Sequence, residues 1–96
     1  MATCSVVFTK ISSSSDVIDA NLVSSELASG AASTASPAEF NYVILTPLDG
    51  NMWAAFTTDG SVPNASVATA RIPLVNGVPF ALYIRKGTRV AVLDRA

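Results

Sequence analysis

Turn dipeptides at regular spacing are the feature that most constrains the fold of this chain. Four of them recur along the last half of the sequence: Asp49-Gly50, Asp59-Gly60, Asn76-Gly77 and Lys86-Gly87. Between them, apolar side chains mostly alternate with polar or small ones, which is the two-residue period of a β-strand. Turn signals at roughly ten-residue spacing are typical of sandwiches and barrels. The sequence therefore predicts an all-β fold, a small antiparallel β-sandwich or barrel that is jelly-roll-like, with a flexible Ser/Ala-rich N-terminal third.

The alternation also predicts where the strands lie. The expected strands are Cys4–Lys10, Phe40–Leu45, Asn51–Thr58, Ala65–Ile72, Val78–Ile84 and Thr88–Asp94. The second of these is apolar on both faces, so we expect a buried central strand that ends before Pro47. Pro73 is expected to close the fourth strand in the same way.

The N-terminal third carries a weaker pattern. Ninety-six residues make one domain, with a β core over 38–96 and an arm or loop-rich part over 1–37. Asp16–Leu27 fits one or two strands or a short helix. Ala28–Ala38 contains no large side chain, so it can bury little and is expected to be a loop or a flexible arm. Val6, Val7 and Phe8 precede a polar hinge at Ser12–Ser15, which suggests an arm that adds a strand to a neighbour's sheet edge.

The residue types present leave little room for catalysis. The chain has no histidine and one cysteine, Cys4, so a serine nucleophile lacks its usual base and no internal disulfide can form. Asp49 and Asp59 each precede a glycine in a turn, at opposite ends of a strand and thus roughly 30 Å apart. They cannot share one acid–base site. The sequence predicts no enzyme, no metal site and no cofactor.

Charge and hydropathy limit the classes of partner that this chain is expected to bind. A net charge of −1 gives no overall attraction to phosphates, so nucleic acid is not an expected partner. The longest apolar run, Val78–Ile84, is far shorter than the about twenty residues of a helical membrane span. The first residues, MATCSVVFTK, lack a secretory pattern, so we expect synthesis in a cytoplasm without export. No membrane partner is expected.

The surface is expected to be buried by association. Half of the residues are apolar and 14% are charged, below the about one quarter that is usual. A small core without a disulfide adds to the need for contacts with other subunits, so a homo-oligomer is expected. Trp53 lies out of phase with Met52 and Phe56. If those two residues face the core, Trp53 faces outward, covered either by the small-residue segment or by a partner.

The order of segments after residue 41 resembles that of a known group. An apolar strand is followed by Asn51-Met52-Trp53-Ala54-Ala55-Phe56, by a polar segment with Pro63 and Ala65, and by Val78-Pro79-Phe80. The chain closes with Lys86-Gly87-Thr88-Arg89-Val90-Ala91-Val92-Leu93. A Trp-x-Ala strand, a Pro/Ala loop and a terminal Gly-x-x-Val/Ile-Ala-Val/Ile strand recur in small virion-associated β-sandwich proteins of tailed bacteriophages, of the capsid decoration or cement type. This chain resembles them over about its last 55 residues.

The resemblance implies a structural virion protein made in the host cytoplasm. Its implied partners are the major capsid protein or other virion subunits, and its implied role is decorating or cementing the capsid by many repeated contacts. A tail, neck or baseplate subunit is an alternative, and so is a module that binds glycans or a host surface through Trp53 and Tyr83. The residues expected at a partner interface are Val6, Val7, Phe8, Trp53, Tyr83, Arg85, Lys86 and Arg89.

Overall fold

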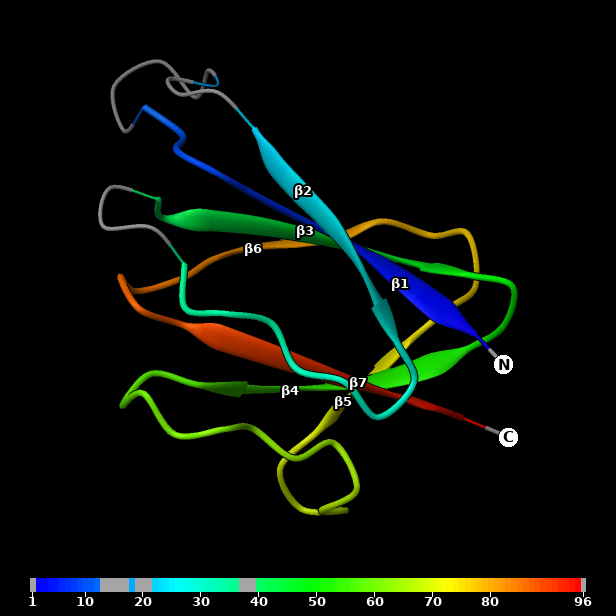
Figure 1. Ribbon diagram of the computed structural model, residues 1–96. Coiled ribbons are helices and arrows are strands. Elements are labelled where there is room, and N and C mark those ends of the chain that lie inside the picture. Colours follow the sequence, from blue (N-terminus) through cyan, green and yellow to red (C-terminus); the bar gives the residue numbers. More distant parts are fainter. Residues whose placement is uncertain (1, 13–17, 19–21, 37–39, 96) are drawn as a thin grey trace.

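The computed structural model of this chain describes residues 2–12, 18, 22–36 and 40–95. They form seven strands and no helix: β1 Thr3–Thr9, β2 Val23–Ala28, β3 Tyr42–Leu48, β4 Met52–Thr57, β5 Ile72–Leu74, β6 Phe80–Tyr83 and β7 Arg89–Asp94. The strands make two antiparallel sheets, ordered β2-β1-β3-β6 and β5-β4-β7, which pack face to face (Figure 1). The prediction of an all-β fold with the character of a small sandwich is confirmed.

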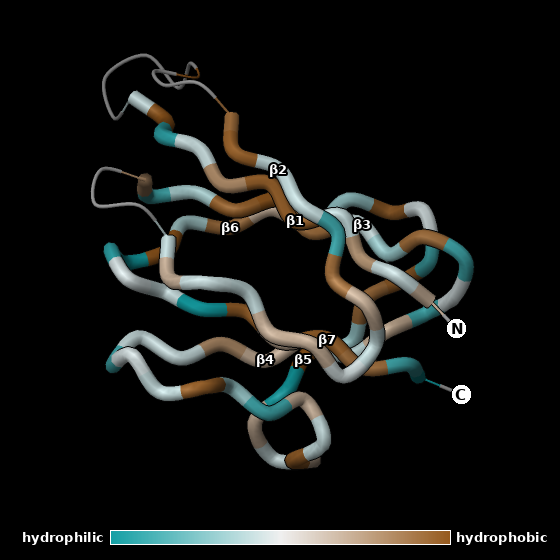
Figure 2. The backbone as a smooth tube through the Cα atoms, viewed as in Figure 1, coloured by the Kyte–Doolittle hydropathy of each residue, from teal (hydrophilic) through white to brown (hydrophobic). Residues whose placement is uncertain are grey.

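The core lies between the two sheets. Its fully buried residues come from alternate positions of the strands, because successive side chains of a strand point to opposite faces. They include Val6, Val43, Leu45, Met52, Leu74, Val90 and Val92. Hydrophilic residues gather at the turn between β6 and β7, drawn in teal in Figure 2.

The Ser/Ala-rich residues 29–36, here called the edge segment, run antiparallel beside β7 (Figure 1). Backbone N–H groups of Gly30, Ser33 and Ser36 donate to carbonyl oxygens of β7 and its preceding turn at 2.7, 2.7 and 2.9 Å. Of the two predicted alternatives, a loop or a flexible arm, the flexible arm is therefore wrong for these residues, which form a mostly irregular segment paired with β7. Small side chains leave the backbone free to pair, and backbone pairing does not require large side chains. Residues 37–39 lie outside the described part.

The strand order is that of a jelly roll. With the edge segment counted in, the second sheet runs β5-β4-β7-edge segment, facing the order β2-β1-β3-β6. Each strand has the same neighbours as in a jelly roll, except that this chain begins with the strand that usually comes last. Such a chain must start and end side by side. The N–H of Ala2 accordingly donates to Asp94 Oδ1 at 3.0 Å, and the two termini lie close together in Figure 1.

The first strand is central, which overturns the N-terminal arm. β1 pairs along its length with β2 on one side and with β3 on the other, and it buries Val6 and Phe8 in the core. A strand that holds two neighbours of its own sheet cannot serve as a detachable arm. Of Asp16–Leu27, the structure gives β2 from Val23 onward, while residues 16–17 and 19–21 lie outside the described part, as do 13–15 of the predicted hinge.

The two strand ends that were predicted from the positions of proline are wrong. β3 continues through Pro47, which lies beyond Leu45, the last residue of β3 that pairs with β6. Pro73 lies inside β5 rather than after it, because β5 is an edge strand and one side of it needs no hydrogen bond.

Two predicted strands are shorter or displaced. The predicted strand over Ala65–Ile72 is wrong, since residues 65–70 mostly form turns. There, Asn64 Oδ1 accepts the backbone N–H of Ser66 at 3.0 Å, a local bond that competes with sheet pairing. At the next predicted strand, β6 is limited to Phe80–Tyr83, and residues 78–79 precede it.

Candidate functional site

The described residues offer no reactive centre of a familiar kind. Cys4 is fully buried, and burial raises the pKa of its thiol from 9.0 to about 11, so the reactive thiolate is disfavoured. Asp49 and Asp59 stand before and after β4, at its two ends. Hydrogen bonds from the side chain and backbone of Ser61 lower the pKa of Asp59, which is a turn interaction. No three His, Cys, Asp or Glu side chains among these residues converge on a metal position, and no helix among them could cross a membrane.

The outer face of the β2-β1-β3-β6 sheet, here called the open face, is nearly free of charge. Because core residues alternate with outward ones, the register defines its members. They are Thr3, Ser5, Val7, Thr9, Ser24, Glu26, Ala28, Tyr42, Ile44, Thr46, Leu48, Ala81 and Tyr83, of which Thr9 is fully buried. Glu26 is the one charged residue in this set. Charge-poor, aromatic-containing surfaces are typical of interface centres.

An apolar row crosses the middle of the open face. Val7 is the register partner of Ile44, and Ile44 is the partner of Ala81 on the next strand. Beside this row, Tyr42 and Tyr83 meet edge to face, with ring centroids 5.0 Å apart. Tyr83 is 59% exposed although it is a large aromatic residue. The row and the tyrosine pair together form a flat, mostly apolar surface.

The outer face of the β5-β4-β7 sheet, here called the covered face, is different. Ala55 and Ala91 pair across β4 and β7 and point away from the core, yet they are only 4% and 5% exposed. Residues 58–71 loop across this side of the sheet (Figure 1), and Pro63 and Ala65 of that loop are buried. The described part of the chain thus covers one outer face with its own loop and leaves most of the other open.

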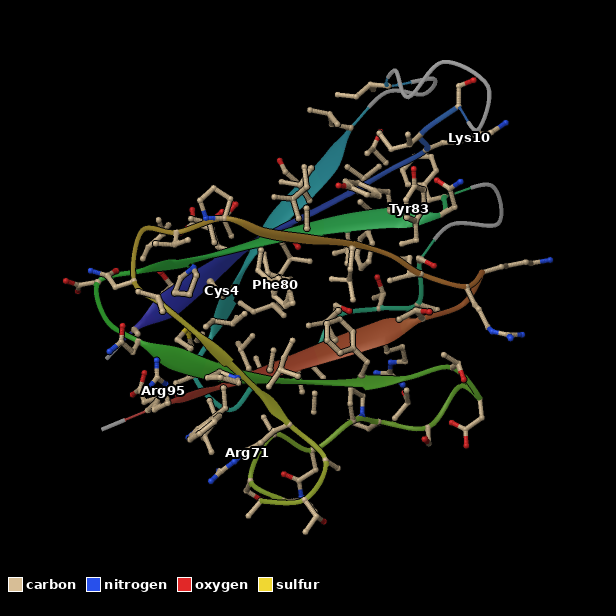
Figure 3. The ribbon with its side chains drawn as sticks, turned by 180° about the vertical axis from the view of Figure 1, so that it is seen from behind. Cys4, Lys10, Arg71, Phe80, Tyr83 and Arg95 are labelled. Carbon is tan, nitrogen blue, oxygen red and sulfur yellow. The ribbon has the colours of Figure 1, made fainter. Side chains whose placement is uncertain are left out.

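Trp53 belongs to the covered face. It points outward from β4, as its phase predicts, and it is half-buried. The guanidinium carbon of Arg71 lies 3.9 Å from the centre of the Trp53 ring, and that of Arg95 lies 5.3 Å away. Two cations of its own chain, which the sequence prediction did not include, pack on the ring, while a partner on its remaining exposed part stays a prediction. In Figure 3, Arg71 and Arg95 lie on the opposite side of the sandwich from Tyr83. A glycan site that uses Trp53 and Tyr83 together is therefore wrong on geometry.

The cationic residues near the last turn divide into two kinds. Arg85 and Lys86 are exposed and lie two and three positions after the open-face residue Tyr83. Arg89 instead donates from Nε to the carbonyl oxygen of Ser33 at 3.0 Å and from its guanidinium to that of Gly60 at 3.3 Å. Arg89 thus ties the edge segment and the covered face together, while the other two remain at the margin of the open face.

A shallow apolar groove of about 260 Å³ opens at the same margin. Its walls come from Phe56 of β4 and from the stretch Leu82–Arg85, with Thr58 and Thr88 at the rim. The groove exists because β5 pairs only with Met52–Ala54 and leaves the rest of β4 without a neighbour on that side. It holds no catalytic grouping, and its apolar walls extend the open face around the sheet edge.

The predicted interface residues are therefore spread over three places. Val7 and Tyr83 lie on the open face and Arg85 and Lys86 at its margin, while Val6 and Phe8 are in the core. Trp53 and Arg89 belong to the other sheet. Sequence reasoning missed Tyr42 and Ile44, although the signal was present: a strand apolar on both sides need not have both sides covered.

Comparisons with family models, with curated proteins and with solved structures found no match for this chain. Its function has to be inferred from the chemistry of its own residues. The contrast between the open and the covered face is the observation with the most bearing on function.

Proposed function

We propose that this chain is a non-enzymatic structural subunit that docks onto another subunit of a phage particle through its open face. Decoration or cementing of the capsid is the form of the proposal that the sequence resemblance favours. The single observation that carries it is the contrast between the two outer faces. One is covered by residues 58–71, and the other presents an apolar row with a single charge.

The composition of the open face suits a protein partner. Interface centres are depleted of charge and enriched in tyrosine relative to the rest of a surface. Val7, Ile44 and Ala81 offer a flat apolar strip, and Tyr83 offers a large exposed ring beside it. Each contact of this size is modest, but many copies on one lattice multiply it into stable attachment.

The margin of the open face adds an electrostatic preference. No carboxylate within the described part of the chain forms an ion pair with Arg85 or Lys86, so both charges remain available to a partner. An acidic patch on a neighbouring subunit would accelerate docking and fix its orientation. This part of the binding should weaken as salt is raised, because exposed charges are screened.

The test is binding to particles that lack this protein, prepared from the virus that encodes it. We expect Ile44→Lys and Tyr83→Lys to weaken binding by roughly tenfold or more, since each places a charge in the centre of a dry contact. The matched control is Val67→Lys, an exposed apolar-to-lysine change in the loop on the covered face, which should bind as the wild type does. Wild-type binding by both open-face variants would contradict the proposal.

Location in the particle needs a second measurement. Electron cryomicroscopy of the particle would give the number and symmetry of the copies. Copies that follow the capsid lattice support decoration, whereas copies that follow the low rotational symmetry of a tail or neck support the tail form of the same role. Absence from the particle, together with turnover of a small molecule by the pure protein, would refute the structural role itself.

A further inference from the structure

Within the described part of the chain, β2 is an outer strand of its sheet and is less protected than the edge strands β5 and β6. The outer edge of β7 is paired with the edge segment, and β5 has three residues and contains Pro73. β6 has four residues, follows Pro79 and leads into two cations. Short edges, prolines and charges are the usual protection against pairing with another chain. β2, by contrast, has six residues and no proline, its one charge is Glu26, and Val23 is 47% exposed.

The backbone phase of β2 defines which groups are available. Ser29 donates its N–H to the Ala2 carbonyl oxygen at 3.3 Å, and the register continues as Thr3↔Ala28 and Cys4↔Leu27. Hydrogen-bonded and non-bonded pairs alternate in an antiparallel ladder. The backbone N–H and C=O groups of Ser24 and Glu26 therefore point away from β1, toward solvent, and both residues are exposed.

We propose that two copies of this chain join through their β2 edges in antiparallel fashion, with Ser25 opposite Ser25 of the second copy. In this register Ser24 lies opposite Glu26 of the second copy, so the outward backbone groups of each meet those of the other. The arrangement is two-fold symmetric, as contacts between identical subunits usually are. It joins the two four-stranded sheets into one.

Charge and apolar area select this register from its neighbours. A shift that puts Glu26 opposite Glu26 brings two carboxylates face to face, which is destabilising. A shift the other way, with Ser24 opposite Ser24, places the exposed Val23 opposite Ser25, where it meets no apolar neighbour. In the Ser25-centred register, Val23 lies opposite Leu27 of the second copy, which covers its exposed side chain. Glu26 meets a serine, which can donate a hydrogen bond to the carboxylate.

The dimer has a consequence for docking that rests on the proposed function. The symmetry axis stands perpendicular to the joined sheet, so the two open faces lie side by side and point the same way. A dimer would then bind a partner lattice through two open faces at once, which raises the avidity without any new kind of contact. The edge contact uses Ser24 and Glu26 at the rim of the open face but not Val7, Ile44 or Tyr83, so each proposal can fail without the other.

Cysteine cross-linking tests the register. Ser25→Cys places two thiols at a non-hydrogen-bonded pair, where Cβ atoms are close enough for a disulfide. Ser24→Cys is the matched control: the two introduced thiols lie diagonally, with Cα atoms about 8–9 Å apart, too far for a disulfide. With oxidised glutathione as oxidant, we expect a covalent dimer for Ser25→Cys alone, and wild type sets the background because Cys4 is buried. Equal cross-linking of both variants, or of neither, overturns the register.

A proline variant tests the contact without cross-linking. Ser24→Pro removes an N–H that faces solvent in the monomer, so the variant should fold. In sedimentation equilibrium at high protein concentration, we expect the wild type to form dimers and Ser24→Pro to remain monomeric. Ala81→Pro is the matched control, because its N–H also points outward, at the edge of β6, and it should dimerise as wild type does. Ile44→Lys should also leave the dimer intact. A folded Ser24→Pro that still dimerises would overturn the proposal, and if Ser24→Pro does not fold, the cross-linking result decides.

Discussion

Ser33→Ala isolates the role of the edge segment in stability. Ser33 is 5% exposed, and its Oγ accepts the backbone N–H of Val90 at 3.0 Å while donating to the carbonyl oxygen of Thr34 at 2.8 Å. Val90 directs both backbone groups toward the edge segment, because its carbonyl oxygen accepts the N–H of Ser33 at 2.7 Å. Removing one oxygen atom from Ser33 therefore leaves a buried N–H of β7 without an acceptor.

The expected loss of unfolding free energy follows from this one unsatisfied backbone N–H. Leaving a buried backbone donor unsatisfied costs about 1–3 kcal/mol of unfolding free energy. For a domain of this size, about 2 kcal/mol lowers the melting temperature by roughly 10 °C. That is a large share of the about 5–14 kcal/mol by which a folded chain of this length is stable.

Urea and thermal unfolding of Ser33→Ala and Thr34→Ala would measure this cost. Thr34 is the next residue of the same segment and also carries a hydroxyl, but its side chain is exposed. Its change to alanine should therefore stay within about 0.5 kcal/mol of wild type. If the two variants are equally stable, the edge segment is not held to β7 as inferred, and the interpretation of a flexible arm would regain its basis.

Three further predictions concern the core and the covered face. Deleting residues 1–10 should abolish folding, because β1 holds β2 and β3 together; a cooperative unfolding transition in the truncated chain would contradict this. The pKa of the Cys4 thiol is raised by folding, so the folded state binds its proton more tightly. Stability should then be full below pH 9 and fall as pH rises from about 9 to 11, and Cys4→Ala should lack this part of the fall in urea titrations. Trp53→Ala should cost about 2 kcal/mol, since it removes a half-buried ring and two cation–π contacts, whereas Arg71→Ala should cost about 1 kcal/mol or less. Equal costs would contradict a contribution of the ring beyond its contact with Arg71.

Part of the candidate site was predictable because it depends on local alternation. Val7 and Tyr83 were expected at an interface, and both lie on the open face. The apolar pattern on both sides of their strand predicts that Tyr42 and Ile44 are in the core. Whether the second side of such a strand is covered depends on what packs on it, and nothing within the strand records that.

Trp53 illustrates the same limit from the other direction. Its outward phase follows from the positions of Met52 and Phe56 alone. The groups that pack on it, Arg71 and Arg95, are brought there by the loop after β4 and by the end of β7. Contacts between residues so far apart in the chain follow from the order of the strands, which no short pattern encodes.

The sequence by itself determined that the chain is all-β and where most strands lie, because side-chain alternation and glycine turns act over a few neighbouring residues. Only the tertiary structure decided that the first strand is central, that the edge segment 29–36 pairs with β7, and that the described loops cover one outer face and leave most of the other open. The physical reason is that backbone hydrogen bonds between strands are nearly indifferent to side-chain identity. Strand neighbours are therefore selected by the packing of the whole chain rather than by any segment of it.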